Sequence, residues 1–335
     1  MQLNEALIRH LASQEAKNRR ATKFFLSQHF DANETAFLER DLTFKRAAVH
    51  EVLFSDLQAK TFLPMANDIP PNAETYSWKV LTQTGKARVG GRGNTDIPRV
   101  DVSGDERTGK TVKIDAAYGW EIEELAEAAR IGFPLMDKKL NAARRAIALG
   151  IDDVLATGKP SGETGLSFTG FINNADVEGL GIINPVSDPW TVATTPASIL
   201  QTLNTMVSEV VSDVGNLQQL YPDTIILPTN EFLVASQVQV DPTNDVSVLR
   251  SFLNNNPFIK NVAFWQKLVG AGAGATNRAI IYKRDPMVLE GVAPLEFMSL
   301  APQAQGFEMV VPCMGRAGGV KVYHPAGVRY ADFTP

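Results

Sequence analysis

One stretch of the sequence, residues 73–115, constrains the fold more than any other. It is polar and extended in character, and its centre, Lys86 to Asn94, is rich in glycine and arginine. About 20 residues run out to this tip and about 20 return, and an extended strand of that length can reach about 60 Å. That reach exceeds the radius of gyration of about 20 Å expected for a globule of 335 residues. Because a lone hairpin is only marginally stable in water, the excursion is either disordered or docked on another molecule, and we favour docking on a second copy.

The segments around the tip have the alternation typical of strands. Residues 74–82 are rich in strand formers, and a period of two places Tyr76, Trp78 and Val80 on one side. A strand pattern resumes over residues 97–102. Residues 112–118 then alternate strictly between apolar and polar or small side chains, which predicts a half-buried strand.

Two helices are predicted directly after the excursion. The first covers residues 120–130 and has three glutamates in its first turn, where they favour the helix dipole. The second begins at Pro134 and ends at Gly158, which corresponds to about 36 Å of helix. Charged residues at positions 138, 139, 144, 145 and 152 lie mainly off its apolar stripe, which consists of Met136, Leu140, Ala143, Ile147, Ile151 and Val154.

The remaining sequence predicts a terminal arm and a second folded region. Residues 1–45 read as an arm with helical pieces, residues 57–69 are β-like, and residues 159–189 are irregular. A helix capped by Thr195 follows, with its stripe running from Ile199 to Val214. Further strands are predicted at 224–227, 279–282, 308–311, 320–323 and 328–333, and short helices at 230–237 and 247–253. This mixture indicates an α/β or α+β domain.

Composition excludes several classes of protein. A single cysteine, Cys313, rules out an internal disulfide and suits a reducing cytoplasm. The net charge of −5 argues against a general nucleic-acid binder. No stretch approaches the roughly 20 apolar residues of a membrane span, and no secretory signal is visible at the start.

The sequence also lacks a recognisable catalytic or metal-binding pattern. The four histidines are scattered, and with one cysteine there is no zinc motif. The glycine runs at 90–93 and 270–274 do not fit a phosphate-binding loop. An enzyme with the excursion as its lid stays a rival hypothesis, but we expect no enzyme, no cofactor and no metal. Lys86, Arg88 and Arg92 could contact nucleic acid, yet without interleaved aromatic residues we expect them to face a partner protein.

The order of arm, extended excursion, long helix, mixed domain and returning strands resembles the major capsid proteins of tailed bacteriophages, whose fold is the Hong Kong 97 type that encapsulin shells share. Local segments carry the same resemblance: Ile69-Pro70-Pro71-Asn72, Thr84-Gly85-Lys86-Ala87-Arg88, residues 97–102, residues 117–125, Gly132-Phe133-Pro134-Leu135 and residues 142–146. The likeness extends from about Val49 to the C-terminus.

The resemblance implies an α+β fold with named regions. Residues 1–50 would be the N-terminal arm, 51–72 a connection, and 73–105 the extended hairpin called the E-loop. Residues 106–189 would form the peripheral (P) domain with a spine helix over 134–157, and 190–310 the axial (A) domain. Residues 311–335 would return as strands of the P domain. The E-loop would lie over a neighbour's P domain, with inter-subunit contacts from Tyr76, Trp78, Lys86, Arg88, Arg92 and Asp96.

The implied function is non-catalytic self-assembly into the icosahedral head shell that encloses double-stranded DNA. The implied partners are copies of the chain in pentamers and hexamers, with scaffold, portal and decoration proteins possible in principle, DNA contacted only indirectly, and no membrane. The place would be the virion, assembled in the bacterial cytoplasm. An encapsulin-like compartment is the alternative.

Some members of the family cross-link a lysine of this loop to an asparagine of a neighbouring subunit. Lys86 is the loop-tip lysine here, but residues 312–335 contain no asparagine that could accept the cross-link. We therefore expect Lys86 to make an ordinary charged contact. We also expect no long scaffold segment before the arm, unless the sequence is already mature.

Overall fold

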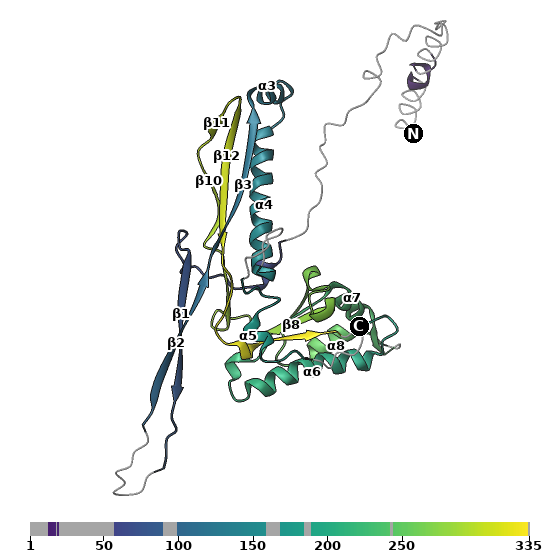
Figure 1. Ribbon diagram of the computed structural model, residues 1–335. Coiled ribbons are helices and arrows are strands. Elements are labelled where there is room, and N and C mark those ends of the chain that lie inside the picture. Colours follow the sequence, from purple (N-terminus) through teal and green to yellow (C-terminus); the bar gives the residue numbers. More distant parts are fainter. Residues whose placement is uncertain are drawn as a thin grey trace, which may run out of the picture. The chain divides into compact units, whose positions relative to one another are not determined.

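The computed structural model describes residues 13–17, 19, 57–89, 99–158, 168–183, 189–241 and 244–333. The chain divides into two units, Met1–Ser55 and Asp56–Pro335. In the first unit the described residues are helical and exposed, and the rest of the predicted arm lies outside the described residues. The second unit holds the strands and all the long helices that are described (Figure 1).

The excursion is a two-stranded antiparallel hairpin. Strands β1 (Thr75–Thr84) and β2 (Asp101–Lys110) pair along their whole length, from Thr75 opposite Lys110 to Thr84 opposite Asp101. The outgoing strand was predicted well. The returning strand, however, begins at Asp101 and continues to Lys110, beyond both the predicted strand at 97–102 and the expected loop end at 105. Its polar sequence lacks the alternation that marks a half-buried strand, so pattern alone could not locate it.

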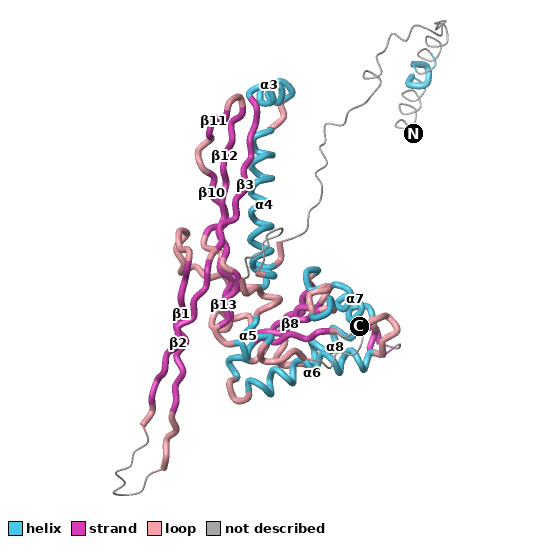
Figure 2. Tube along the Cα trace, in the orientation of Figure 1, coloured by secondary structure: helices cyan, strands magenta, loops and turns pink. Residues whose placement is uncertain are grey.

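A second sheet is built on the strand that follows the hairpin. Strand β3 (Val112–Glu121) pairs with all ten residues of β12 (Glu308–Ala317), which also pairs with β10 (Leu295–Ser299) and β11 (Gln303–Gln305). Helix α3 (Ile122–Ile131) follows β3, and the long helix α4 (Leu135–Thr157) runs beside β3 (Figure 2). These elements confirm the predicted half-buried strand and both predicted helices.

Helix α4 packs tightly onto this sheet through part of its predicted stripe. Ala143, Ile147, Ile151 and Val154 are buried. Close packing depends on a glycine opposite the helix, because a Cβ on Gly315 of β12 would lie 2.5 Å from Ile147. The helix ends at Gly158, whose φ of 70° is left-handed and whose missing Cβ would lie 1.8 Å from the carbonyl oxygen of Phe168.

Three predictions about this region are wrong. Residues 57–69 were expected to be β-like but contain the short helix α2 (Ala59–Phe62), which packs into the core. Met136 was placed in the buried stripe but is 37% exposed, because Leu135, and not Met136, packs against the core at the start of α4. Asp152 was expected on the polar face but is buried, where it accepts a bond from the Ala59 amide at 2.9 Å and one from Lys267 at 2.6 Å.

A third sheet has the strand order β14, β8, β4, β7. Its strands are β14 (Val328–Asp332), β8 (Arg278–Tyr282), β4 (Thr224–Leu227) and β7 (Asn261–Phe264), with β4 and β7 parallel and the other pairs antiparallel. The helices α6 (Pro196–Val214), α7 (Thr229–Gln237) and α8 (Val248–Asn255) accompany it. The stripe of α6 is buried as predicted, and β4 covers the predicted residues.

The expected boundaries at 310 and 311 do not match the strand pairing. Strand β14 was expected to return to the P domain, but it pairs with β8 in the third sheet. Conversely, β10 and β11 fall inside the expected A domain, yet they pair with β12 in the second sheet. The backbone therefore crosses between the two sheets more often than sequence order indicated.

Short elements complete the second unit. Strand β13 (Gly319–Val322) pairs with β9 (Leu289–Val292), and β5 (Gln239–Asp241) pairs with β6 (Asn244–Ser247). The short helices are α5 (Ala175–Glu178), η1 (Gln218–Leu220), η2 (Gln266–Leu268), η3 (Ala273–Ala275) and η4 (Pro325–Gly327).

Candidate functional site

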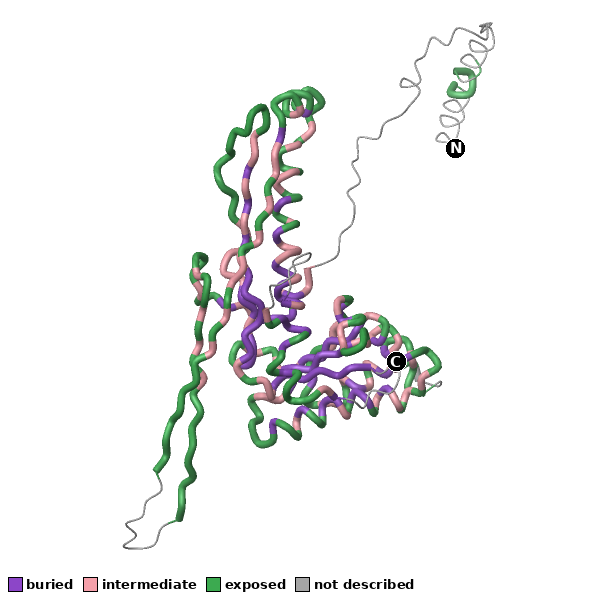
Figure 3. Tube along the Cα trace, viewed as in Figure 1, coloured by how far each residue is buried: buried purple, intermediate pink, exposed green. Residues whose placement is uncertain are grey.

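The hairpin has two different apolar faces. Tyr76, Trp78 and Val80 alternate along β1 as half-buried residues, and beyond them the strand is exposed (Figure 3). On the opposite face Leu81 is 68% exposed, Val100 66% and Val102 54%. The register brings these three side chains together, because Leu81 pairs with Gly104, Gln83 with Val102, and Gly85 lies directly against Val100. We call Leu81, Val100 and Val102 the outer apolar face of the hairpin.

The inner face of the hairpin is anchored by Tyr76. Its ring lies over two glycines: a Cβ on Gly109, its cross-strand partner, would be 2.3 Å from the ring, and a Cβ on Gly318 would be 3.0 Å from it. The Tyr76 hydroxyl donates a hydrogen bond of 2.8 Å to the carbonyl oxygen of Gly318. The phenol therefore fixes the first residues of the hairpin to the turn between β12 and β13.

A cluster of aromatic and charged residues extends this anchor. The Trp78 ring stacks near Tyr76, with centroids 5.7 Å apart, and meets Tyr323 edge-on at 6.3 Å. The Tyr323 hydroxyl donates to Glu290 at 2.8 Å. The ammonium of Lys321, only 3% exposed, lies 5.1 Å from the centre of the Tyr76 ring, where burial strengthens a cation–π contact.

The returning strand has an anchor of its own. Arg107 of β2 pairs with Asp176 of α5 at 2.8 Å, and both side chains are partly exposed. Such an exposed pair contributes at most about 1 kcal/mol. Its main effect is on position, because it holds β2 to α5, whereas Tyr76 holds β1 to the turn between β12 and β13.

The Tyr76 anchor predicts a distinctive alkaline titration. Burial raises the pKa of Tyr76 from 10.0 to about 12. A raised pKa means that the folded chain favours the neutral phenol, so the stability it contributes is complete below pH 10 and is lost as the pH rises from 10 to about 12. Subtracting the tyrosinate absorbance of a Tyr76→Phe variant from that of the unaltered chain should reveal a phenol that ionises above pH 10. A difference spectrum in which this phenol ionises at its ordinary pH of about 10 would contradict the anchor.

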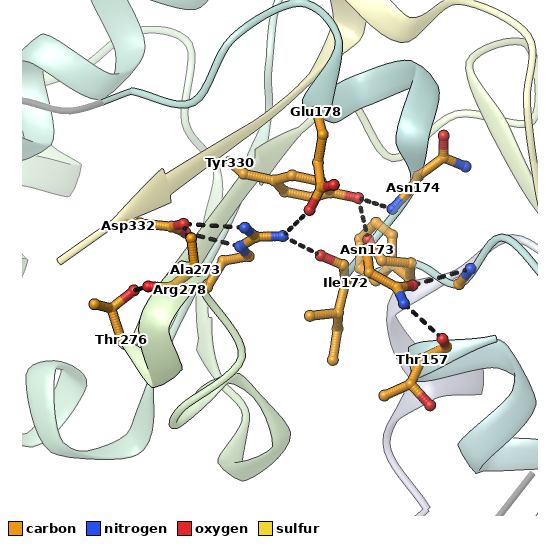
Figure 4. A network of polar contacts seen from close by, with 12 residues as sticks. Thr157, Ile172, Asn173, Asn174, Glu178, Ala273, Thr276, Arg278, Tyr330 and Asp332 are labelled. Atoms are coloured by element: carbon orange, nitrogen blue, oxygen red, sulfur yellow. Dashed lines mark hydrogen bonds and ion pairs between the residues drawn. The ribbon is translucent and has the colours of Figure 1, made fainter. Parts of the chain in front are cut away.

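A buried ionic network joins the third sheet to the segment that follows α4 (Figure 4). Arg278 of β8 is 2% exposed and bonds both carboxylate oxygens of Asp332, at 2.7 and 3.0 Å. Its guanidinium also donates to Glu178 at 2.6 Å and to the Ile172 carbonyl at 2.8 Å, and lies over the ring of Tyr330. Bidentate, charge-assisted bonds of this kind are the strongest polar contacts in proteins.

Tyr330 completes the network from β14. Its hydroxyl donates to the Phe171 carbonyl at 2.6 Å and accepts from the Asn174 amide at 3.1 Å. Burial raises the pKa of Tyr330 above its ordinary value, so the hydroxyl remains a donor at neutral pH. Residues 171–178 are thereby held against the strands that carry Arg278 and Asp332.

The second sheet is covered by α4 on one face and keeps an apolar opposite face. Val311 and Cys313 of β12 are buried toward the helix, whereas Val310, Pro312 and Met314 alternate with them and are half-buried. Pro312 and Met314 line a groove of about 310 Å³, together with Leu300, which is 44% exposed, and with the ion pair of Lys113 and Asp115. We call Val310, Pro312, Met314 and Leu300 the uncovered sheet face.

The residues that were predicted to form inter-subunit contacts have different surroundings in the structure. Tyr76 and Trp78 were expected to face a neighbour, but their rings pack against their own chain. Lys86 and Arg88 are exposed on the approach to the tip, while Arg92 and Asp96 lie outside the described residues. Of the helix stripe, Ile147, Ile151 and Val154 belong to the core and Leu140 is half-buried; they support the sheet and present no contact surface.

Sequence reasoning missed the residues that anchor the hairpin and join the sheets. Tyr76 is 242 residues from Gly318, and Arg278 is 54 residues from Asp332 and 100 from Glu178. No local spacing connects such distant positions. The one available signal was the pairing of Tyr76 and Trp78 on one side of a strand, which indicates burial without naming what covers it.

No described helix is long and apolar enough to cross a membrane. Within the described ranges, no group of three or more histidine, cysteine, aspartate or glutamate side chains is arranged to hold a metal ion.

Comparisons with known proteins agree on one kind of relative. A family model described as "Major capsid protein" matches residues 85–333. The solved chain of "The capsid of Myoviridae Phage XM1" has 16% sequence identity and a TM-score of 0.73, over 89% of this chain and 99% of that one. A chain from Mycobacterium phage Adephagia has 13% identity and a TM-score of 0.58, over 87% and 96%. A virus-like particle from Pyrococcus furiosus has 11% identity and a TM-score of 0.50, over 81% and 90%. At such identities these structures indicate a shared fold. A search of curated proteins finds no match.

Proposed function

Because the chain belongs to the major capsid protein family, we propose that its hairpin is the element that joins one copy to the next in a closed icosahedral shell. The family and the capsid structures confirm the predicted α+β fold of the Hong Kong 97 type and the function of a shell-forming capsid protein. The alternative of an encapsulin-like compartment is less supported, since the family match is to capsid proteins.

One observation carries the proposal for the hairpin. The outer apolar face exposes Leu81, Val100 and Val102 on a hairpin whose anchors at Tyr76 and Arg107 lie near its base. Exposed, clustered apolar side chains on a projecting element mark an interaction site. Covering each of these side chains would contribute about 1 kcal/mol.

The second half of the contact would be the uncovered sheet face of a neighbouring copy. Pro312, Met314 and Leu300 line a shallow groove that could receive the outer apolar face, beside the charged side chains of Lys113 and Asp115. Each contact is weak, but every subunit of a closed shell makes it once as donor and once as acceptor. Closed symmetry therefore converts many weak contacts into a stable particle.

The same proposal includes the grouping of the copies, the contents of the shell, the place of assembly and the further partners. The copies would group as pentamers and hexamers, the shell would enclose double-stranded DNA, and assembly would take place in the bacterial cytoplasm. Scaffold, portal and decoration proteins are compatible partners. Lys86 and Arg88, with Arg92, would meet carboxylates of a neighbouring copy near the tip, and no catalytic step is required of any residue.

A pair of substitutions on adjacent residues tests the docking face. Leu81→Glu places a charge on the outer apolar face and should reduce assembly at least tenfold, because a desolvated carboxylate opposes docking. Thr82→Glu adds the same charge on the opposite side of the strand and should leave assembly within about twofold of the unaltered chain. Light scattering and sedimentation velocity would measure both. Equal assembly by the two variants would refute the outer face as the docking surface.

A further inference from the structure

The base of the hairpin is a joint built around one side chain. Along β1 the half-buried residues are Tyr76, Trp78 and Val80, and the strand beyond them is exposed. Tyr76 contacts both the partner strand and the body, through Gly109 and Gly318, and donates a hydrogen bond to the latter. The angle of the hairpin is therefore set where the phenol sits.

The joint is made rigid by contacts from several elements. Lys321 of β13 lies against the Tyr76 ring, with Asp68 at 3.6 Å and Glu290 at 4.0 Å from its ammonium. On the other strand, the Arg107 ion pair fixes β2 to α5. Contacts on both strands resist rotation of the hairpin better than two contacts on one strand, because a rotation that preserves the contact of one strand disrupts the contact of the other.

A long hairpin amplifies any looseness at this joint. The eight residue-to-residue steps from Tyr76 to Thr84 span about 27 Å of strand, so a rotation of ~10° at Tyr76 displaces the strand end by ~5 Å. Such a displacement is about the separation of neighbouring strands, ~4.8 Å. It is enough to misplace the outer apolar face relative to a groove.

We infer that Tyr76, seated on Gly109 and Gly318, is the positioning residue that sets the hairpin angle before assembly and thereby makes the shells uniform in size. This inference rests on the proposed function of the hairpin. It adds that the angle is fixed within the single subunit by the fit of the phenol over two glycines, and is not imposed by the neighbour during docking.

Two glycines of the same strand provide a matched test. Gly109→Ala adds a methyl 2.3 Å from the Tyr76 ring and must displace it, whereas Gly104→Ala adds the same methyl 3.2 Å from the flexible end of Leu81. Spin labels at Gln83→Cys and Ser208→Cys, both exposed positions, would report the distance between hairpin and body in the unassembled subunit. The distance distribution should be narrow in the parent and in Gly104→Ala, and at least twofold wider in Gly109→Ala.

Electron microscopy of the same proteins without labels provides the second readout. Gly104→Ala should form shells of one diameter, and Gly109→Ala should form open or variable particles from subunits that are still folded at the assembly temperature. Tyr76→Leu removes the phenol without adding atoms beside the glycines, and it should behave like Gly109→Ala. It replaces Gly109→Ala in both measurements if that variant does not fold. A narrow distance distribution in the joint variants would overturn the inference, as would uniform shells despite a loosened joint. If the unaltered chain formed no shells, the proposed function would be refuted instead. The distance measurement would still decide whether Tyr76 sets the angle of the hairpin.

Discussion

Replacing Arg278 with methionine is expected to destabilise the subunit by about 3 to 5 kcal/mol. The substitution keeps the volume of the side chain but leaves Asp332, whose side chain is 9% exposed, without its bidentate partner. It also removes the partner of Glu178 and the donor to the Ile172 carbonyl. An unpaired buried carboxylate is much more costly than the loss of the bond itself.

Urea unfolding of unassembled subunits would measure this effect. Arg284→Met removes an exposed arginine close in sequence to Arg278 and should change stability by less than about 0.5 kcal/mol. Arg278→Lys keeps the charge but cannot form the fork and should fall between the two. An Arg278→Met subunit as stable as the parent would show that the network does not hold the third sheet to residues 171–178.

Deleting residues 85–96 is expected to abolish shell formation and leave the subunit folded. The deletion removes Lys86, Arg88, Arg92 and Asp96 but preserves β1, β2 and the Tyr76 anchor. Because the described residues next to the tip are exposed, their loss should change the free energy of unfolding by less than about 0.5 kcal/mol. The melting temperature of the dilute subunit separates this outcome from simple unfolding.

Helices and buried strands were predictable where local pattern and burial agree. The stripe of α6 is buried along its whole length, and the continuous apolar run Thr224–Leu227 is a buried strand. The stripe of α4 was right where the helix faces the sheet and wrong at Met136. Periodicity identifies the side of a helix that is apolar, but it does not tell where the covering element ends.

Polar residues with distant partners could not be placed in this way. Asp152 reads as a surface residue of a helix, yet Lys267, 115 residues away, neutralises it in the core. Strand β2 reads as a loop because Asp105, Glu106 and Arg107 alternate with nothing apolar, although its pairing with β1 is complete. Backbone hydrogen bonding to a partner strand, and not burial, makes that segment a strand.

The location of the candidate site on the excursion stays a prediction, and the structure shows which of its side chains already have partners in their own chain. The excess length of the excursion indicated an intermolecular element, which is the feature that still carries the proposal. Its aromatic residues were assigned to a neighbour, but Tyr76 and Trp78 are half-buried against Gly318 and Tyr323. The exposed apolar residues lie on the opposite face. Their grouping depends on the cross-strand register, which could not be predicted because the sequence does not show where the glycine-rich tip begins and ends.

Negative-stain electron microscopy of the intact chain and of the chain lacking residues 85–96, purified side by side at matched high concentration, tests the central claim most directly. We expect closed shells from the intact chain and dispersed, folded subunits from the shortened one. Closed shells in equal yield from both proteins would show that the tip of the hairpin does not join the subunits, and single subunits from both would contradict self-assembly itself.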